Sequence, residues 1–130
     1  MNTFTCLLVD DDVDDREIFC AVMEVIAPAS TCLTAVNGKV ALEMVNTDKV
    51  LPDIIFLDLN MPLMSGPQFL QEVNRQKILQ DIPIVVLTTS ADASTKATML
   101  KSGAAAFVTK PDKFSEWETV LRQILENCLK

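Results

Sequence analysis

Short apolar runs and helical patterns alternate five times along this 130-residue chain, and this alternation limits the folds open to it. The apolar runs are mostly rich in β-branched or aromatic residues and are bounded by turn or charged residues, as buried strands are. They cover Phe4–Val9, Thr31–Val36, Ile54–Leu57, Ile84–Leu87 and Ala105–Thr109. Each run is therefore predicted to be a strand that is buried on both faces.

The segments between these strands carry the periodicity of amphipathic helices. In the first segment Ile18, Val22 and Ile26 recur every four residues. The clearest stripe, in the last segment, consists of Trp117, Leu121, Ile124 and Cys128. Five strand–helix pairs with short loops predict a parallel sheet covered by helices on both faces. We expect an α/β protein with a doubly wound, flavodoxin-like (βα)5 fold and strand order 2-1-3-4-5.

Polar residues follow the predicted strands at the points where they end. They are Asp10, Asp11 and Asp12 after the first strand, Asp58 after the third, Thr88, Thr89 and Ser90 at the end of the fourth, and Lys110 after the fifth. In doubly wound folds ligands bind beyond the carboxyl ends of the strands, at the switch point between strands 1 and 3. These side chains are therefore expected to share one pocket.

The stretch "LLVDDDVDD" places five carboxylates within six positions, where like charges repel one another. A hard cation such as Mg²⁺, which prefers carboxylate, carbonyl and water oxygen, would make this crowding tolerable. Asp10 and Asp11 are accordingly predicted to form half of a metal cage. Asp12 is better explained as the cap of the following helix, with Asp14 and Asp15 favourable in its first turn.

Asp58 is the natural nucleophile of the predicted pocket, because an aspartyl carboxylate can form an acyl phosphate. The ammonium of Lys110 and the hydroxyl of Thr88 can hold the remaining phosphoryl oxygens. Alone, Lys110 could be an ordinary surface lysine and Thr88 a residue that merely favours strands. Only the combination of strand ends indicates phosphoryl chemistry.

Composition removes several classes of function. The chain has no histidine, which excludes imidazole general-base catalysis, histidine-ligated zinc and a role as a phosphohistidine donor. A net charge of −7 argues against direct nucleic-acid binding. The N-terminal sequence "MNTFTCLLVDDD" resembles neither a signal peptide nor a membrane span. A cytoplasmic protein is expected, with its four cysteines reduced in the core.

The motifs "LLVDDD", "IIFLDLNMPLMSG", "PIVVLTT" and "SGAAAFVTKP" resemble the receiver domain of bacterial response regulators, over essentially the whole chain. This resemblance implies that Asp58 accepts phosphate from a sensor histidine kinase, a hybrid kinase or a phosphotransfer protein. It also implies that Mg²⁺ or Mn²⁺ is held by Asp10, Asp11, Asp58 and the backbone carbonyl of Asn60, with Asp11 acting most directly.

The resemblance further implies a switch. Thr88 would move to bind the phosphoryl group, Lys110 would pair with it, and Phe107 would turn inward. The face made by the fourth helix, fifth strand and fifth helix would then change its affinity for a partner protein. Such a receiver catalyses its own phosphorylation and slow dephosphorylation but is not an enzyme with steady turnover. The alternative for Phe107 is ordinary core packing of the fifth strand.

Three positions are predicted to tune the lifetime or the rate of phosphorylation. Thr89 stands where many receivers carry alanine or glycine, and its bulk is expected to restrict access to Asp58. Asn60 and Ser90 flank the same pocket, and neither offers an obvious acid or base.

We expect one receiver domain over residues 1–130 without an output domain, which signals through protein contact or passes phosphate on. The last helix carries more apolar residues than one narrow stripe needs, namely Val120, Leu121, Leu125 and Leu129. Either this helix is well buried or it forms a homodimer face.

Three other functions compete with this interpretation. A haloacid-dehalogenase-type phosphatase would use Asp10 as its nucleophile, but the chain shows no acidic pair after the fourth strand. A flavodoxin-like FMN protein would need a Ser/Thr/Gly-rich loop where the chain has carboxylates. A pseudo-receiver, which binds partners without phosphate, is the third alternative.

Overall fold

A computed structural model describes residues 3–47, 51–59, 66–76, 79–89 and 92–129. Its centre is a sheet of five parallel strands in the order β2-β1-β3-β4-β5. The strands are β1 (Thr5–Val9), β2 (Thr31–Ala35), β3 (Ile54–Leu57), β4 (Ile84–Thr88) and β5 (Ala106–Thr109). The predicted fold class and strand order are confirmed, and every predicted strand lies within one residue of its observed bounds.

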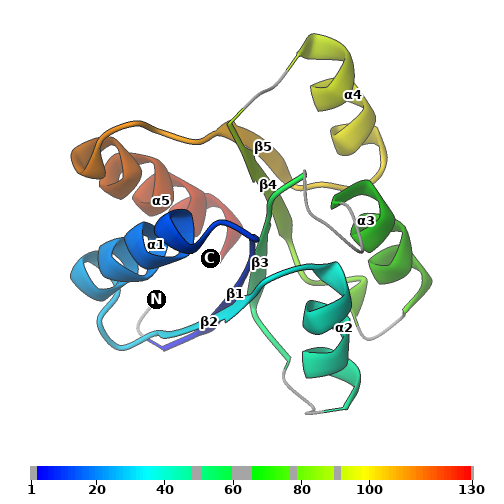
Figure 1. Cartoon of the computed structure of the whole chain (residues 1–130), viewed down its shortest axis with the longest axis horizontal. Coiled ribbons are helices and arrows are strands. Elements are labelled where there is room, and N and C mark those ends of the chain that lie inside the picture. The colour runs from blue at the N-terminus through cyan, green and yellow to red at the C-terminus, as the bar shows by residue number, and fades with distance from the viewer. Residues whose placement is uncertain (1–2, 48–50, 60–65, 77–78, 90–91, 130) are drawn as a thin grey trace.

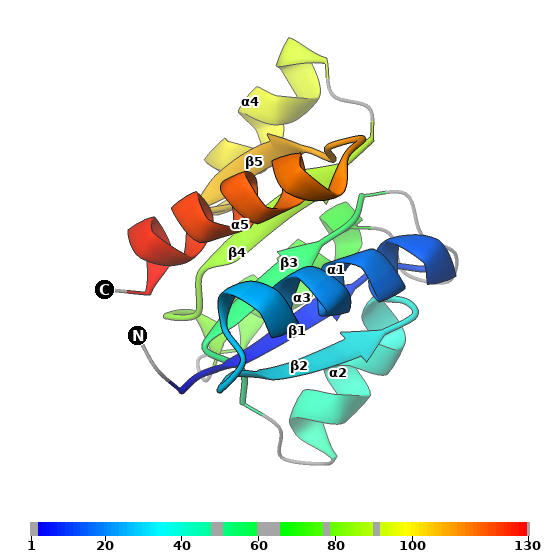
Figure 2. The same ribbon diagram turned by 90° about the vertical axis from the view of Figure 1, so that its left-hand side faces the viewer.

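Five helices alternate with the strands. They are α1 (Val13–Ile26), α2 (Gly38–Asn46), α3 (Gly66–Arg75), α4 (Ala93–Lys101) and α5 (Phe114–Cys128). Helices α1 and α5 lie side by side on one face of the sheet, and α2, α3 and α4 cover the other face (Figures 1 and 2). Within the described parts of the chain, no helix combines the length and the apolar character needed to cross a membrane.

The sheet is buried on both sides, which explains why its strands are continuous apolar runs. Along β1, Cys6 and Leu8 pack against the α1/α5 layer, whereas Leu7 and Val9 pack against the α2/α3/α4 layer. The apolar residues of α5 take part in the first of these layers. Leu121 and Leu125 are buried, and Val120 and Leu129 pack partly buried against them. Burial therefore accounts for the broad apolar stripe, and a homodimer stays a prediction.

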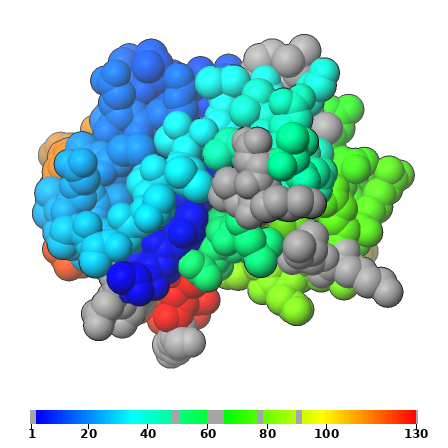
Figure 3. Space-filling model, turned by 90° about the horizontal axis from the view of Figure 1, so that it is seen from below, coloured from blue at the N-terminus to red at the C-terminus, as the bar shows by residue number. Residues whose placement is uncertain are grey.

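Local signals place the start of the helices near the carboxyl ends of the strands. Asp12 caps α1, because its Oδ1 accepts a hydrogen bond of 3.0 Å from the backbone N–H of Asp15. Asn37 caps α2 through a bond of 2.9 Å from the N–H of Val40. The start of β1 and the end of α5 lie together at the opposite edge of the molecule (Figures 2 and 3).

Candidate functional site

Three carboxylates meet where β1 and β3 end. Asp10, Asp11 and Asp58 each offer an oxygen within 4.8 Å of the others. The sheet fixes two of these residues, because the N–H of Asp10 donates to the carbonyl of Ala35 at 3.0 Å and that of Asp58 to Val9 at 2.9 Å. Asp10 and Asp58 are buried, and Asp11 is exposed. The structure thus brings together the carboxylates that the sequence predicted.

Lys110 joins this cluster from the end of β5. Its backbone N–H donates to the carbonyl of Thr88 at 2.8 Å, which continues the β4–β5 ladder by one residue. Its Nζ donates to Oδ2 of Asp10 at 2.8 Å and lies 3.7 Å from Oδ1 of Asp58. Only 5% of the lysine side chain is exposed. Lys110 is therefore a buried cation of the site and not an ordinary surface lysine.

Two further residues of α1 contact this cluster, and the sequence pattern did not predict either contact. Asp15 lies in the first turn of α1, as predicted, and its Oδ2 also accepts a hydrogen bond of 2.7 Å from Nζ of Lys110. Nη1 of Arg16 donates to the backbone carbonyl of Asp10 at 2.9 Å. Their position one turn into a helix that starts at the cluster is the only sequence signal for them.

Burial dominates the electrostatics of the carboxylates. It raises the pKa of Asp58 to about 6, against the opposing effect of the Lys110 ammonium, and the neighbouring Asp10 carboxylate adds to the rise. The pKa of Asp10 is also raised by burial, although its hydrogen bond from Lys110 opposes this. Asp58 therefore ionises near neutral pH, within the range at which a nucleophilic carboxylate is useful.

Burial also lowers the pKa of Lys110, but hydrogen bonds with Asp10 and Asp15 outweigh this effect and hold the pKa above its usual value. The side chain consequently stays a cation at neutral pH. A buried cation next to a buried carboxylate is suited to pair with an anionic group, such as a phosphoryl group, that arrives between them.

Thr88 lies at the end of β4 beside this cluster and is fully buried. Its Oγ1 has no hydrogen-bond partner among the residues that the structure describes. An unsatisfied buried hydroxyl costs about 1–3 kcal/mol, so each such group calls for an explanation, and a role in binding a ligand is one. This orphan donor fits the predicted phosphoryl-binding role of Thr88.

Of the remaining predicted residues, the structure describes Phe107 and Thr89. Phe107 is half-buried and packs against the core under α2, α3 and α4. Thr89 is exposed next to Thr88. Asn60 and Ser90 lie outside the described residues.

Gly66, at the start of α3, presses against the backbone that follows Asp58. Its N–H donates to the carbonyl of Leu59 at 2.9 Å. A Cβ at this position would lie 2.7 Å from Cα of Leu59 and 2.8 Å from the carbonyl oxygen of Asp58. Only glycine fits here without a shift of the backbone, so Gly66 helps to hold Asp58 in place.

The donor set fits a hard divalent cation. Carboxylate oxygen is the preferred protein ligand of Mg²⁺ and suits Mn²⁺, and three such groups converge within reach of a single ion. Asp10, Asp11 and Asp58 would supply these ligands. Asp11 is the exposed member of the three, whereas Asp10 and Asp58 are buried.

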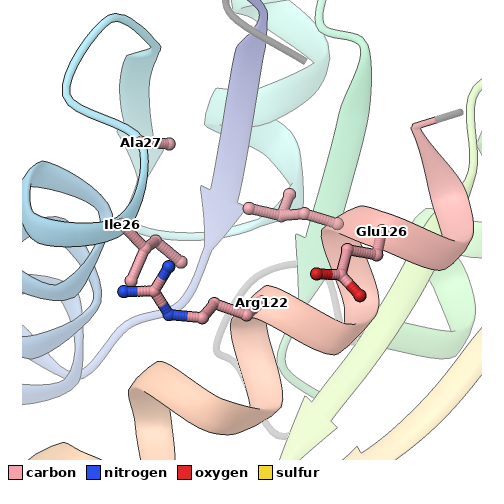
Figure 4. Close-up of a pocket in the computed structure, with 5 residues that line it drawn as sticks. Ile26, Ala27, Arg122 and Glu126 are labelled. Atoms are coloured by element: carbon pink, nitrogen blue, oxygen red, sulfur yellow. The ribbon is translucent and has the colours of Figure 1, made fainter.

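A cavity of about 170 Å³ lies elsewhere, between α1 and α5. It is lined by Ile26, Ala27, Arg122, Leu125 and Glu126 (Figure 4). None of the clustered carboxylates lines it, and its residues come from the end of α1 and the second half of α5, far from the carboxyl ends of the strands. The candidate functional site, at the strand ends, is thus separate from this cavity.

Comparison with known proteins identifies the family of this chain. The family model for the response regulator receiver domain matches residues 6–122. The chain is 39% identical over 129 residues to a protein-glutamate methylesterase/protein-glutamine glutaminase of Treponema pallidum. That match covers 96% of this chain but only 31% of the relative, so the chain spans less than a third of that protein's length.

Solved structures of response regulators share the fold. The phosphorylated cyanobacterial phytochrome response regulator RcpA superposes with a TM-score of 0.89 at 24% identity, covering 98% of this chain and 95% of that one. The chemotaxis protein CheY4 of Vibrio cholerae gives a TM-score of 0.81 at 28% identity, with coverages of 95% and 99%. With a family model that spans nearly all of its sheet and helices, the chain belongs to the response regulator receiver domains, the phosphoacceptors of two-component signalling.

Proposed function

We propose that Asp58 is the phosphoacceptor of this receiver and takes its phosphoryl group from a histidine kinase, a hybrid kinase or a phosphotransfer protein. One observation carries this proposal: the Asp58 carboxylate is buried between two further carboxylates and the Lys110 ammonium. A nucleophile, a cation site and a positive group for phosphoryl oxygens thus lie within a few ångströms of one another. This combination suits phosphoryl transfer better than any other chemistry of the chain.

The transfer step follows from the properties of these groups. An ionised oxygen of Asp58 forms a bond to phosphorus while the bond from phosphorus to the donor breaks, and the donor leaves with the electron pair. Asp10, Asp11 and Asp58 would hold Mg²⁺ or Mn²⁺, which when bound neutralises charge on the phosphoryl oxygens. The ammonium of Lys110 pairs with another of these oxygens, and the hydroxyl of Thr88 donates a hydrogen bond.

Thr88 links this chemistry to signalling in the proposal. Its hydroxyl, which has no partner among the described residues, gains one when a phosphoryl group is present, so phosphorylation favours the conformation in which this bond forms. Movement of Thr88 and inward rotation of the half-buried Phe107 then alter the face of α4, β5 and α5. That face binds a downstream protein, and a homodimer is the second complex that we propose to test. A net charge of −7 supports a protein partner over nucleic acid.

The remaining predicted residues tune the reaction. The exposed Thr89 stands beside Thr88, where it limits approach to Asp58. The carbonyl of Asn60 is proposed as a further cation ligand, and Ser90 as a second flank of the pocket. The receiver catalyses its own phosphorylation and slow dephosphorylation in this scheme.

Intact mass after incubation with acetyl phosphate and Mg²⁺ tests the assignment. The wild-type chain and an Asp81→Asn control, in which an exposed aspartate away from the cluster is changed, are expected to gain one phosphoryl group. Asp58→Asn should gain none, and Asp11→Ala or a chelator should abolish or strongly slow the gain. A single adduct that persists in Asp58→Asn would disprove the role of Asp58.

The pseudo-receiver is the second candidate, and the same material distinguishes it. A folded wild-type chain that forms no adduct and binds no beryllofluoride in the presence of Mg²⁺ would favour partner binding without phosphate. The family match speaks against the phosphatase and FMN alternatives.

A further inference from the structure

The ion pair between Asp15 and Lys110 is the shortest contact that the ammonium makes among the described residues. Nζ of Lys110 lies 2.7 Å from Oδ2 of Asp15, 2.8 Å from Oδ2 of Asp10 and 3.7 Å from Oδ1 of Asp58. Asp15 comes from the first turn of α1, where its backbone N–H is tied to the cap residue Asp12 at 3.0 Å. Its side chain is 23% exposed, so the pair is only partly shielded from water. The ammonium thus lies closer to Asp15 of α1 than to Asp58, the proposed phosphoacceptor.

We propose that Asp15 is a positioning residue that holds the Lys110 ammonium away from Asp58 before phosphorylation. An ammonium has three N–H donors, and hydrogen bonds to Asp10 and Asp15 occupy two of them. Asp15 thereby sets a balance between the affinity of the site for a divalent cation and its affinity for a phosphoryl group. This inference rests on the proposed function of Asp58.

The first consequence concerns the cation. A positive ammonium close to Asp10 and Asp58 repels a divalent cation bound by the same carboxylates. Asp15 weakens this repulsion, because it draws the ammonium toward α1 and adds a negative charge of its own near the site. Loss of the Asp15 charge is therefore expected to weaken Mg²⁺ binding by about three- to tenfold, the effect of a partly exposed charge.

The second consequence concerns the phosphoryl group, whose binding Asp15 is expected to weaken. A phosphoryl group on Asp58 adds negative charge and competes with Asp15 for the ammonium of Lys110. Without the Asp15 charge, Lys110 is free to pair with the phosphoryl oxygens and the site is less negative. Binding of an anionic phosphoryl mimic at saturating Mg²⁺ is therefore expected to become about three- to tenfold tighter. A residue with a merely structural role would weaken both affinities when replaced.

The test compares Asp15→Asn with Asp14→Asn. Asp14 lies in the same helical turn and is exposed, whereas the ion pairs of Lys110 in the described part of the chain are with Asp10, Asp15 and Asp58. Replacement of Asp14 thus removes an equal charge without freeing the ammonium. Calorimetry measures the dissociation constant of Mg²⁺, and fluorine NMR measures that of beryllofluoride at saturating Mg²⁺. Only Asp15→Asn should shift the two constants in opposite directions, and Asp15→Glu, which keeps the charge, should return both to within about twofold of wild type.

The outcomes separate the inference from the function on which it rests. If Asp15→Asn weakens both ligands, leaves both unchanged, or behaves like Asp14→Asn, the inference is wrong while the function of Asp58 stands. If the folded wild-type chain binds no beryllofluoride, the proposed function fails and the inference with it. Asp15→Ser provides the same loss of charge should the asparagine variant not fold.

Discussion

Oδ1 of Asp58 lies 3.7 Å from Nζ of Lys110, within reach of an ion pair but beyond a hydrogen bond. The two groups therefore attract each other without being locked together, and a phosphoryl oxygen can take the place between them. Lys110 is therefore expected to stabilise a bound phosphoryl group and to weaken the binding of Mg²⁺ by the neighbouring carboxylates.

Replacement of Lys110 by methionine is expected to slow phosphoryl transfer and to tighten the binding of Mg²⁺. Phosphoryl transfer from acetyl phosphate should slow by at least about tenfold, because one charged hydrogen bond to the phosphoryl group is lost. Mg²⁺ should bind more tightly, because a positive charge next to its ligands is removed. Single-turnover mass spectrometry and calorimetry measure the two effects, with the exposed Lys101 replaced by methionine as the control. Weaker Mg²⁺ binding in Lys110→Met would contradict this account.

The raised pKa of Asp58 predicts how stability changes with pH in the absence of metal. The pKa is about 6 in the folded chain against an ordinary value of 3.8, so the folded state binds the proton more tightly than the unfolded state. The stabilisation that Asp58 contributes is therefore fully present below about pH 4 and is lost as pH rises through about 6. The magnitude is about 3 kcal/mol for a shift of this size in a largely buried group.

Denaturant unfolding with a chelator present checks this pH dependence. Asp58→Asn cannot ionise, so its free energy of unfolding should rise relative to wild type by about 2–3 kcal/mol between pH 4 and pH 7. The contribution of Asp10 to the pH dependence is present in both proteins, so it largely cancels in the difference between their free energies of unfolding. A difference that stays flat across this range would show that burial does not hold the proton on Asp58.

The fold and the placement of the main candidate site residues at one edge of the sheet were predictable, because both depend on strand positions alone. Once Ile54–Leu57 and Ile84–Leu87 are known as neighbouring parallel strands, Asp58 and Thr88 must lie at the same edge of the sheet. The same logic placed Asp10 and Lys110. These residues needed no knowledge of side-chain conformation.

The contacts of Asp15 and Arg16 could not be predicted in this way. Asp15 was expected to act through the helix dipole, but its carboxylate reaches Lys110, 95 residues later in the chain. Such contacts depend on how α1 is rotated against the sheet and on how far a side chain extends, and neither follows from periodicity. The constraint on Gly66 was missed for a similar reason, because it arises from the close approach of α3 to Leu59.

Gly66→Ala is expected to disturb the backbone that carries Asp58. The added Cβ would meet backbone atoms of Asp58 and Leu59 at under 3 Å, so α3 or the chain after β3 must move. We expect a loss of about 1–3 kcal/mol in the free energy of unfolding, as for other overpacked positions. Chemical denaturation measures this loss, and the rate of acetyl phosphate transfer should fall as well. Unchanged stability with a normal rate would mean that the contact relaxes at no cost.

Thr89→Ala is expected to speed the reaction with small phosphodonors. Thr89 is exposed beside the buried Thr88, so its removal opens the approach to Asp58 without a loss of core packing. Initial rates with acetyl phosphate should exceed those of wild type by several-fold, whereas Thr98→Ala, at an exposed threonine of α4, should not change them. Equal rates for Thr89→Ala and wild type would remove the gating role of this residue.

The thiols of Cys20 and Cys32 are predicted to react slowly although they touch. Their Sγ atoms lie 3.1 Å apart, with Cys32 also beside its β1 neighbour Cys6. Burial raises the pKa of Cys20 to about 12. The pKa of Cys32 is also raised, mainly by a hydrogen bond with Cys6 and in second place by burial. The thiolate, which is the reactive form, is therefore scarce at neutral pH.

Alkylation by iodoacetamide at pH 8, followed by mass spectrometry, checks the prediction. Each unit of raised pKa lowers the thiolate fraction about tenfold, so Cys20 should react at least about 100-fold more slowly in the folded chain than in denaturant. Val25→Cys on the exposed side of α1 supplies an internal control that should react at the ordinary rate. Rapid labelling of Cys20 in the folded chain would show that water reaches the pair, and that burial does not protect these cysteines in their reduced form.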